Sequence, residues 1–179
     1  MTSNNERLSK FISLILRHKP EAIGITLDEF GYANVCELIE GINDSGRYID
    51  LNILKNIVKD DKKGRFIFDE SMTLIRANQG HSINVNVELK KVTPPRYLFH
   101  GTAKKNLDSI IDNGIKKMNR LYVHLSDNTS TATKVGARHG EPIVLKIDSQ
   151  KMYGNGFEFY LSENHVWLVE FVPSEYINL

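Results

Sequence analysis

Cysteine is almost absent from the chain, because Cys36 is the single cysteine among 179 residues. A lone cysteine excludes an internal disulfide framework and a thiolate zinc site. We expect a buried apolar role for Cys36, which lies among Val35, Leu38 and Ile39. Long apolar runs are also missing, since no stretch approaches the ~18 residues that a membrane-spanning helix needs. The polar N-terminus has no apolar signal segment behind it, so we expect a cytoplasmic protein with no membrane partner.

The chain also lacks an excess of charge of one sign. It has 23 Lys and Arg against 22 Asp and Glu, and neither half departs strongly from balance. Such a chain has no extended basic surface for a long nucleic acid, although a few local arginines suffice for a small anionic target. Its 41% of hydrophobic and 25% of charged residues are typical of a folded globular protein.

Several catalytic signatures are missing as well. The six histidines have no cysteine partners, no HExxH pattern and no clustered carboxylates, so we expect no metal site. The GxSxG elbow of serine hydrolases, the GxGxxG fingerprint and the P-loop do not occur. What remains is a set of Arg and His donors without an obvious carboxylate base, which suits an ionised phosphate as the ligand.

The first half of the chain predicts three helices followed by a β-hairpin. Apolar periodicity predicts helices over residues 9–18, 35–42 and 51–58, and alternation predicts strands over residues 65–68 and 73–76. Three helices and a two-stranded wing suggest a winged-helix domain.

Prolines after residue 92 predict a domain boundary, because Thr93-Pro94-Pro95 restricts the backbone and breaks any helix. Gly114 should end a helix that begins near Lys104, and Asp127 or Asn128 should cap the next one. The remaining pattern predicts strands over residues 97–100, 122–125, 143–147, 157–161 and 166–171 and helices over residues 104–113 and 129–135. We therefore expect an α+β protein with domains 1–92 and 93–179, the second a mixed, strand-rich domain.

Two clusters of Arg and His stand out in the first domain. Arg17-His18 ends the first predicted helix, where basic side chains also complement the helix dipole. Arg65 opens the hairpin and residues 76–82 close it with a string of hydrogen-bond donors. Taken alone, that string is more typical of a solvated wing and linker.

A third cluster joins two predicted strand ends in the second domain, residues 99–102 and 123–126. Each end carries a histidine before a turn or helix, although a histidine that is satisfied in a core is the commoner outcome for either one. Glycines at 136 and 140 flank Arg138 further along the chain. Small residues let the backbone approach a pyrophosphate and an arginine neutralises it, so the cluster favours a nucleotide pocket.

Seven strings along the chain resemble those of the RNA 2′-phosphotransferase family of KptA type. They are Leu8–Phe11 with Leu16–His18, Arg65-Phe66, Ile75–Ser82, Leu98–Thr102, Val123–Ser126, Arg138–Gly140 and Val166–Leu168. The resemblance implies an RNA-binding lobe of winged-helix type and a C-terminal lobe with the ADP-ribosyltransferase fold. It also implies NAD as a consumed co-substrate and an RNA with a 2′-phosphate as the partner. We expect that RNA to be a tRNA with a splice-junction phosphate, and the protein to be a monomer.

The resemblance implies a two-step reaction. The RNA 2′-phosphate attacks C1″ of the NAD⁺ ribose and expels nicotinamide, which gives an ADP-ribosylated RNA intermediate. The 2″-hydroxyl then attacks the phosphate, which releases 2′-OH RNA and ADP-ribose 1″,2″-cyclic phosphate. The matching catalytic residues are Arg17, His18, Arg65 and Arg120, with the acid or base role of His18 left open.

One departure from the family bears on the assignment of Arg120. Tyr122 stands where the family's Arg-x-His-[Val/Ile]-His motif has its first histidine. Arg138 is therefore a competing candidate for the phosphate clamp, although we assign it to NAD⁺.

These matches lead to two sets of binding residues. His100, His124 and Val166 fit the His-His-apolar triad of this branch of the ADP-ribosyltransferase fold. We assign NAD⁺ binding to His100, Gly101, Thr102, Asn113, Gly114, His124, Leu125, Ser126, Gly136, Arg138, His139, Gly140 and Val166. We assign RNA binding to Arg76, Asn78, Gln79, His81 and Ser82.

Two other functions remain open. An ADP-ribosyltransferase that caps terminal nucleic-acid phosphates would stop after the first step, whereas Arg17, His18 and Arg65 favour the complete reaction. A winged-helix DNA-binding regulator with a nucleotide-sensing lobe needs a basic recognition helix, and residues 51–59 offer only Lys55 and Lys59.

Overall fold

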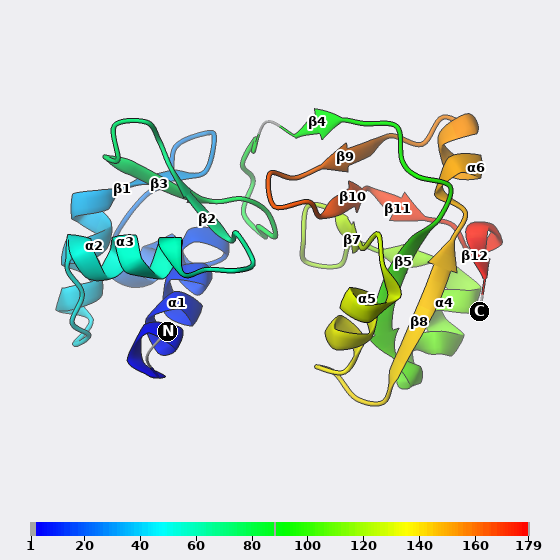
Figure 1. Cartoon of the computed structure of the whole chain (residues 1–179), viewed down its shortest axis with the longest axis horizontal. Helices are drawn as coiled ribbons and strands as arrows, with labels where there is room; N and C mark the ends of the chain where they lie inside the picture. The colour runs from blue at the N-terminus through cyan, green and yellow to red at the C-terminus, as the bar shows by residue number, and fades with distance from the viewer. Residues whose placement is uncertain (1–2, 88, 179) are drawn as a thin grey trace. The chain divides into compact units, whose positions relative to one another are not determined.

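The computed structural model describes residues 3–87 and 89–178. The chain divides into two compact units, residues 1–88 and residues 89–179, and each has its own hydrophobic core (Figure 1). Helices and antiparallel sheets occur in both units, so the protein is α+β, as the sequence predicts. Within the described residues, no helix is both long and apolar enough to cross a membrane.

The N-terminal unit contains the three predicted helices and the predicted hairpin. Its elements are α1 (Ser3–Arg17), η1 (Pro20–Ile23), β1 (Tyr32–Asn34), α2 (Val35–Asp44), α3 (Leu51–Lys59), β2 (Phe66–Phe68) and β3 (Leu74–Ala77). The side chain of Asn34 caps α2 and that of Asp50 caps α3 by accepting backbone N–H groups. Strand β1 was not predicted, and it pairs with β3 to give the sheet order β1-β3-β2.

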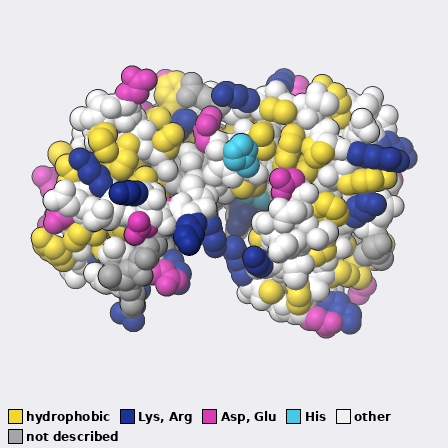
Figure 2. Space-filling view, viewed as in Figure 1, with side chains coloured by type: hydrophobic (Ala, Val, Ile, Leu, Met, Phe, Trp, Pro, Cys, Tyr) yellow, Lys and Arg dark blue, Asp and Glu magenta, His cyan; other side chains and the backbone are white. Residues whose placement is uncertain are grey.

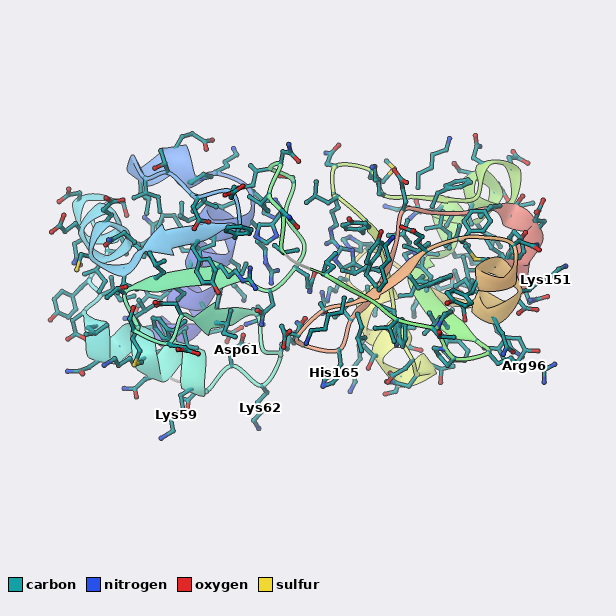
Figure 3. The ribbon with its side chains drawn as sticks, turned by 90° about the horizontal axis from the view of Figure 1, so that it is seen from above. Lys59, Asp61, Lys62, Arg96, Lys151 and His165 are labelled. Atoms are coloured by element: carbon teal, nitrogen blue, oxygen red, sulfur yellow. The ribbon has the colours of Figure 1, made fainter. Side chains whose placement is uncertain are left out.

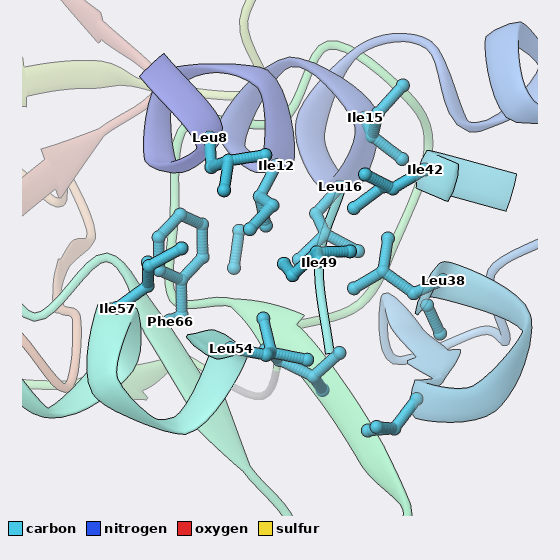
Figure 4. Packing of buried hydrophobic residues seen from close by; sticks show 14 of the residues in the cluster. Leu8, Ile12, Ile15, Leu16, Leu38, Ile42, Ile49, Leu54, Ile57 and Phe66 are labelled. Carbon is cyan, nitrogen blue, oxygen red and sulfur yellow. The ribbon is translucent and has the colours of Figure 1, made fainter. Parts of the chain in front are cut away.

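The core of this unit forms where the apolar faces of the helices meet the sheet. Ile12 and Leu16 of α1 point toward Leu38 of α2 and Leu54 of α3, and all four are fully buried (Figure 4). Cys36, by contrast, is exposed, so the expectation of a buried cysteine was wrong. The buried positions of α2 are Val35, Leu38 and Ile42, which leaves the position of Cys36 on the solvent side of the helix.

The C-terminal unit is rich in short strands. Its helices are η2 (Lys104–Asn106), α4 (Leu107–Asn113), α5 (Thr129–Gly136), α6 (Ser149–Gly154) and η3 (Ser174–Tyr176). Its strands are β4 (Lys90–Lys91), β5 (Leu98–Ala103), β6 (Ile115–Lys116), β7 (Val123–Leu125), β8 (Pro142–Ile147), β9 (Phe159–Leu161), β10 (Trp167–Val169), β11 (Phe171–Val172) and β12 (Ile177–Asn178). They form sheets of order β4-β9-β10-β7, β12-β8-β5 and β11-β6.

Helix α6 and strands β6 and β12 of this unit were not predicted, and two strand boundaries differ from the sequence prediction. The single strand expected over residues 166–171 is two strands, because β10 pairs with β7 and β9 whereas β11 pairs with β6. Strand β4 pairs with β9, so residues 89–92 pack with the C-terminal unit, although the sequence placed the division near residue 92.

Candidate functional site

The end of α1 is held by a segment more than sixty residues away in sequence. The backbone N–H of Ser82 donates to the Arg17 carbonyl oxygen at 3.0 Å, and a 2.9 Å hydrogen bond joins Ser82 Oγ to His18 Nδ1. Gly80 has a left-handed φ of +89°, and a Cβ there would lie 3.6 Å from Arg17 Nη1. A glycine therefore lets the chain turn close beside the guanidinium. The structure thus brings Arg17, His18 and residues 80–82 together.

Two further basic side chains lie beside this group. His81 is only 1% exposed, and burial, aided by the charges of Arg17, His18 and Arg76, lowers the pKa of its imidazole to about 4. Arg76 is 8% exposed, donates from Nη1 to the Phe30 carbonyl oxygen at 3.3 Å and lies over the Tyr32 ring. At neutral pH the cluster is therefore cationic through its arginines, while His81 stays neutral, and such a set of donors suits an anion.

Arg65 is fixed by contacts that the sequence analysis missed. Its Nη1 donates to Asp61 Oδ1 at 2.9 Å and to Ser9 Oγ at 3.2 Å, and its backbone N–H also donates to the Asp61 carboxylate. The Asp61 side chain is only 3% exposed, whereas Lys59 at the end of α3 and Lys62 in the following turn point outward (Figure 3). The rise along α1 from Ser9 to Arg17 is about 12 Å, at 1.5 Å per residue.

Asn78 joins the end of β3 to the turn before Arg65. Its backbone N–H donates to the Arg65 carbonyl oxygen at 2.9 Å, and its Nδ2 donates to the Gly64 carbonyl oxygen at 2.7 Å. An aspartate in a turn was the one available signal for the Asp61 contact, because Asp side chains often accept backbone N–H groups of their own turn, as Asp61 does from Lys63.

In the C-terminal unit, backbone contacts fix the tautomers of two histidines. His100 on β5 is bonded through Nδ1 to the His124 carbonyl oxygen at 3.0 Å, and His124 on β7 through Nδ1 to the Tyr122 carbonyl oxygen at 3.1 Å. A carbonyl oxygen only accepts, so both Nδ1 atoms carry hydrogen. The neutral rings therefore have Nε2 as their acceptor atom, a geometry suited to hydroxyl donors.

Arg120 and Arg138 lie near these histidines. Burial lowers the pKa of His100, and the charge of Arg120 adds to this effect although the His124 carbonyl opposes it. Arg120 is exposed, yet partial desolvation and the neighbouring charge of Arg138 lower the pKa of its guanidinium below its ordinary value. The structure thus brings His100, His124, Arg120 and Arg138 into one group, with two guanidinium groups beside two imidazoles.

The predicted pocket glycines have a packing role in the structure. A Cβ on Gly101 would lie 1.7 Å from the Ala132 carbonyl oxygen, and one on Gly136 would lie 2.6 Å from the Thr102 carbonyl oxygen. Both positions lie where α5 crosses β5, so they need glycine for helix–strand packing. Gly114, with φ +73°, has the Val172 carbonyl oxygen 2.3 Å from its Cβ position.

The other predicted NAD⁺ residues occupy varied surroundings. Leu125 is buried in the core, whereas Asn113, His139 and Gly140 are exposed. Thr102 Oγ1 accepts from Asn106 Nδ2, and Ser126 exchanges two backbone hydrogen bonds with Phe99 that hold β7 beside β5. Val166, just before β10, donates its N–H to Ser162 Oγ.

Tyr122, the residue that departs from the family motif, belongs to an aromatic pair. Its ring lies 5.5 Å from that of Tyr160, whose hydroxyl donates to Glu158 Oε2 at 2.7 Å. That hydrogen bond is the main reason why the pKa of Tyr160 is raised to about 12. Tyr160 lies two strands away from Tyr122 in the sheet, so spacing in the sequence gave no signal for this contact.

A comparison with protein families shows which family this chain belongs to. The profile described as RNA 2′-phosphotransferase, Tpt1/KptA family, matches residues 3–171, nearly the whole chain. This chain belongs to the RNA 2′-phosphotransferase family. It is therefore a transferase, and its substrate is an RNA.

Similar proteins agree with this membership of the phosphotransferase family. A probable RNA 2′-phosphotransferase of Fusobacterium nucleatum is 56% identical over 97% of this chain and 98% of its own length. One from Flavobacterium johnsoniae is 51% identical over 95% and 93%, and one from Acaryochloris marina is 47% identical over 98% and 97%. The matches extend through both units of this phosphotransferase.

Proposed function

We propose that this phosphotransferase removes an internal 2′-phosphate from RNA and consumes NAD⁺ in doing so. The products would be 2′-OH RNA, nicotinamide and ADP-ribose 1″,2″-cyclic phosphate, and a spliced tRNA would be the physiological substrate. The observation that carries the proposal is the cluster of Arg17, His18 and Arg76 at the end of α1, in a protein whose net charge is only +1. A 2′-phosphate is mostly dianionic near neutral pH and matches these donors.

The N-terminal unit would bind the RNA as a winged-helix lobe. Three helices and the sheet β1-β3-β2 support this assignment. The segment of Arg76, Asn78, Gln79, His81 and Ser82 connects the hairpin to the end of α1, and we place the nucleotides beside the 2′-phosphate there.

Charge on the phosphate would rise in the second step, when the 2″-hydroxyl attacks phosphorus. Fixed guanidinium groups stabilise such charge better than water does, because they need not reorient. The Arg17 guanidinium lies close to Gly80, and Arg65 is held by Asp61 and Ser9, which would preorganise Arg65 for this task. His18 would exchange a proton with the ribose hydroxyl or the departing RNA oxygen.

The C-terminal unit would hold NAD⁺ as an ADP-ribosyltransferase-like lobe. Nε2 of His100 and of His124 would accept hydrogen bonds from ribose hydroxyls, as their fixed tautomers allow. Arg138 would neutralise the pyrophosphate, while its neighbour Arg120 would contribute to the phosphate clamp. Bound NAD⁺ supplies an electrophilic ribose carbon and a good leaving group, so a phosphate that is already ionised needs no base to attack it.

The decisive experiment uses a short RNA with one internal 2′-phosphate. The full-length protein is incubated with this RNA in EDTA, with and without NAD⁺, and the products are analysed. We expect 2′-OH RNA and the cyclic phosphate only when NAD⁺ is present. Release of phosphate without NAD⁺ would contradict the proposal, and a product that stops at an ADP-ribosylated terminal phosphate would favour the capping activity instead.

A further inference from the structure

The hydroxyl of Ser82 touches the imidazole that the proposed reaction needs. Its Oγ lies 2.9 Å from His18 Nδ1, and its backbone N–H separately donates to the Arg17 carbonyl oxygen at 3.0 Å. The backbone bond fastens the segment to α1, so the hydroxyl bond is not required for that purpose. The hydroxyl bond can therefore serve to orient the imidazole.

We infer that Ser82 is a positioning residue, which holds the His18 ring so that Nε2 is the nitrogen that exchanges the proton with substrate. A partly buried imidazole can adopt more than one ring orientation unless one of its nitrogens is tied. The bond to Ser82 ties Nδ1 in either tautomer, since a hydroxyl both donates and accepts. In this proposal Nε2 is then the nitrogen that exchanges the proton, whatever the direction of transfer.

This role rests on the proposed function, in which His18 moves a proton during the second step. There the 2″-hydroxyl loses a proton as its oxygen bonds to phosphorus, and the RNA 2′-oxygen gains one as its bond to phosphorus breaks. His18 would carry that proton through Nε2, and the ring would keep its hydrogen bond to Ser82 throughout. Ser82 itself makes and breaks no covalent bond.

The contact also distinguishes Ser82 from its neighbours in the RNA-binding segment. A residue that bound RNA directly would affect the KM for RNA and leave the His18 ring unchanged. A positioning residue would affect the ring in the free protein and kcat in the reaction. These are different observables, so one variant separates the two roles.

The variant Ser82→Ala removes the hydroxyl and keeps the backbone N–H bond to Arg17, and Ser82→Thr keeps a hydroxyl at the same atom. A matched control is Ser45→Ala, in the same unit at the end of α2, which loses the hydroxyl bond to the Ile42 carbonyl oxygen and the bond that Arg47 Nη1 donates to Ser45 Oγ. The histidine ring nitrogens of all four proteins are followed by NMR in the absence of substrates. Turnover is followed with the 2′-phosphate RNA and NAD⁺.

We expect Ser82→Ala to change the His18 tautomer or titration, while the His100 signals in the other unit stay constant. The second step should slow by about 5- to 10-fold, the effect of one hydrogen bond, so that ADP-ribosylated RNA accumulates at an unchanged KM for RNA. Ser82→Thr should restore both readouts, and Ser45→Ala should alter neither.

Three results would overturn the inference. The first is an unchanged His18 ring in Ser82→Ala. The second is a raised KM for RNA at constant kcat, which would make Ser82 a direct RNA contact. The third is an altered ring without any kinetic effect. A parent protein that releases no phosphate with NAD⁺ would refute the proposed function, and the ring signals would still decide whether Ser82 holds His18.

Discussion

His81 is a buried base among basic neighbours, and this has a consequence for stability. Within the described residues, neither of its ring nitrogens makes a hydrogen bond. The unfolded chain binds a proton at this residue below about pH 6.5, whereas the folded protein binds it only below about pH 4. Unfolding therefore takes up a proton between these values, so stability is lost as the pH falls through this window.

We predict that His81 alone makes unfolding easier by about 3 kcal/mol at pH 4 than at pH 7. His81→Leu removes this titration and sacrifices no hydrogen bond seen in the described residues. Chemical denaturation of both proteins at a series of pH values measures the difference, since the other titrating groups are common to both. Parallel pH dependences for the parent and the variant would show that His81 is accessible to protons in the folded state.

Replacing His100 or Arg65 by alanine should slow different steps of the proposed reaction. His100→Ala removes an acceptor from the NAD⁺ side, so the first step should slow and no ADP-ribosylated RNA should build up. Arg65→Ala removes a clamp that matters most when charge develops on phosphorus, so the intermediate should accumulate. A gel time course with labelled RNA distinguishes the two outcomes.

A useful control for these variants is His165→Asn. His165 is exposed with φ +58°, a left-handed backbone that asparagine also tolerates, and it has no assigned role. Turnover should stay at the parent level. If Arg65→Ala blocks the intermediate as severely as His100→Ala does, Arg65 serves substrate binding instead of the second step.

Sequence alone singled out candidate functional residues here without showing what holds them. The pair Arg17-His18 and the segment 76–82 were singled out by residue type, but their contact spans 64 positions and has no local signature. Ser9 and Asp61, which fix Arg65, were missed because an apolar helix face and a charged turn look structural. Cys36 was misplaced because apolar neighbours in sequence lie on another face of a helix.

At the scale of elements, the packing of α5 on β5 depends on residues without side chains. Gly101→Ala would place a methyl group 1.7 Å from the Ala132 carbonyl oxygen, which is backbone and cannot rotate away. We predict that this variant is destabilised by at least ~1 to 3 kcal/mol, the usual cost of overpacking, because α5 must shift. Thermal unfolding measures the loss.

Gly154→Ala is the matched control for that variant. Gly154 ends α6 in the same unit, and a Cβ there would meet nothing within 4 Å. The free energy of unfolding of Gly154→Ala should stay within about 1 kcal/mol of the parent value, because alanine here only reduces the conformational freedom of the unfolded chain. Equal effects of the two substitutions would mean that α5 adjusts without cost and that the packing role assigned to Gly101 is wrong.

Elements were predicted where a pattern had room to repeat. The apolar stripe of α1, from Leu8 to Leu16, covers more than two turns, and only its polar first turns were missed. Strands β4, β6 and β12 have two residues each and are defined by pairing with a neighbouring strand. They are too short to show an alternating pattern in the sequence. The break between β10 and β11 likewise comes from a change of partner, which sequence spacing does not record.

At the scale of the whole molecule, the charge balance bears on how RNA is bound. The net charge is +1, and basic and acidic side chains appear on both units in the face that Figure 2 shows. A protein of this kind has few cations to spare for a long phosphate backbone. Affinity would therefore come from the 2′-phosphate and a few flanking nucleotides, which contact the local cluster around Arg17.

Binding through this local cluster predicts that RNA affinity depends only weakly on salt concentration. With about three phosphates neutralised, the slope of log K against log salt should be about −2, since each contact on single-stranded RNA contributes roughly −0.7. Fluorescence anisotropy with a labelled 2′-phosphate RNA, from about 50 to about 200 mM salt, measures this slope. The same RNA without the 2′-phosphate should compete weakly at every salt concentration. Equal competition by that RNA, or a slope several times steeper, would mean that an extended surface binds the backbone and that the cluster at the end of α1 does not select the substrate.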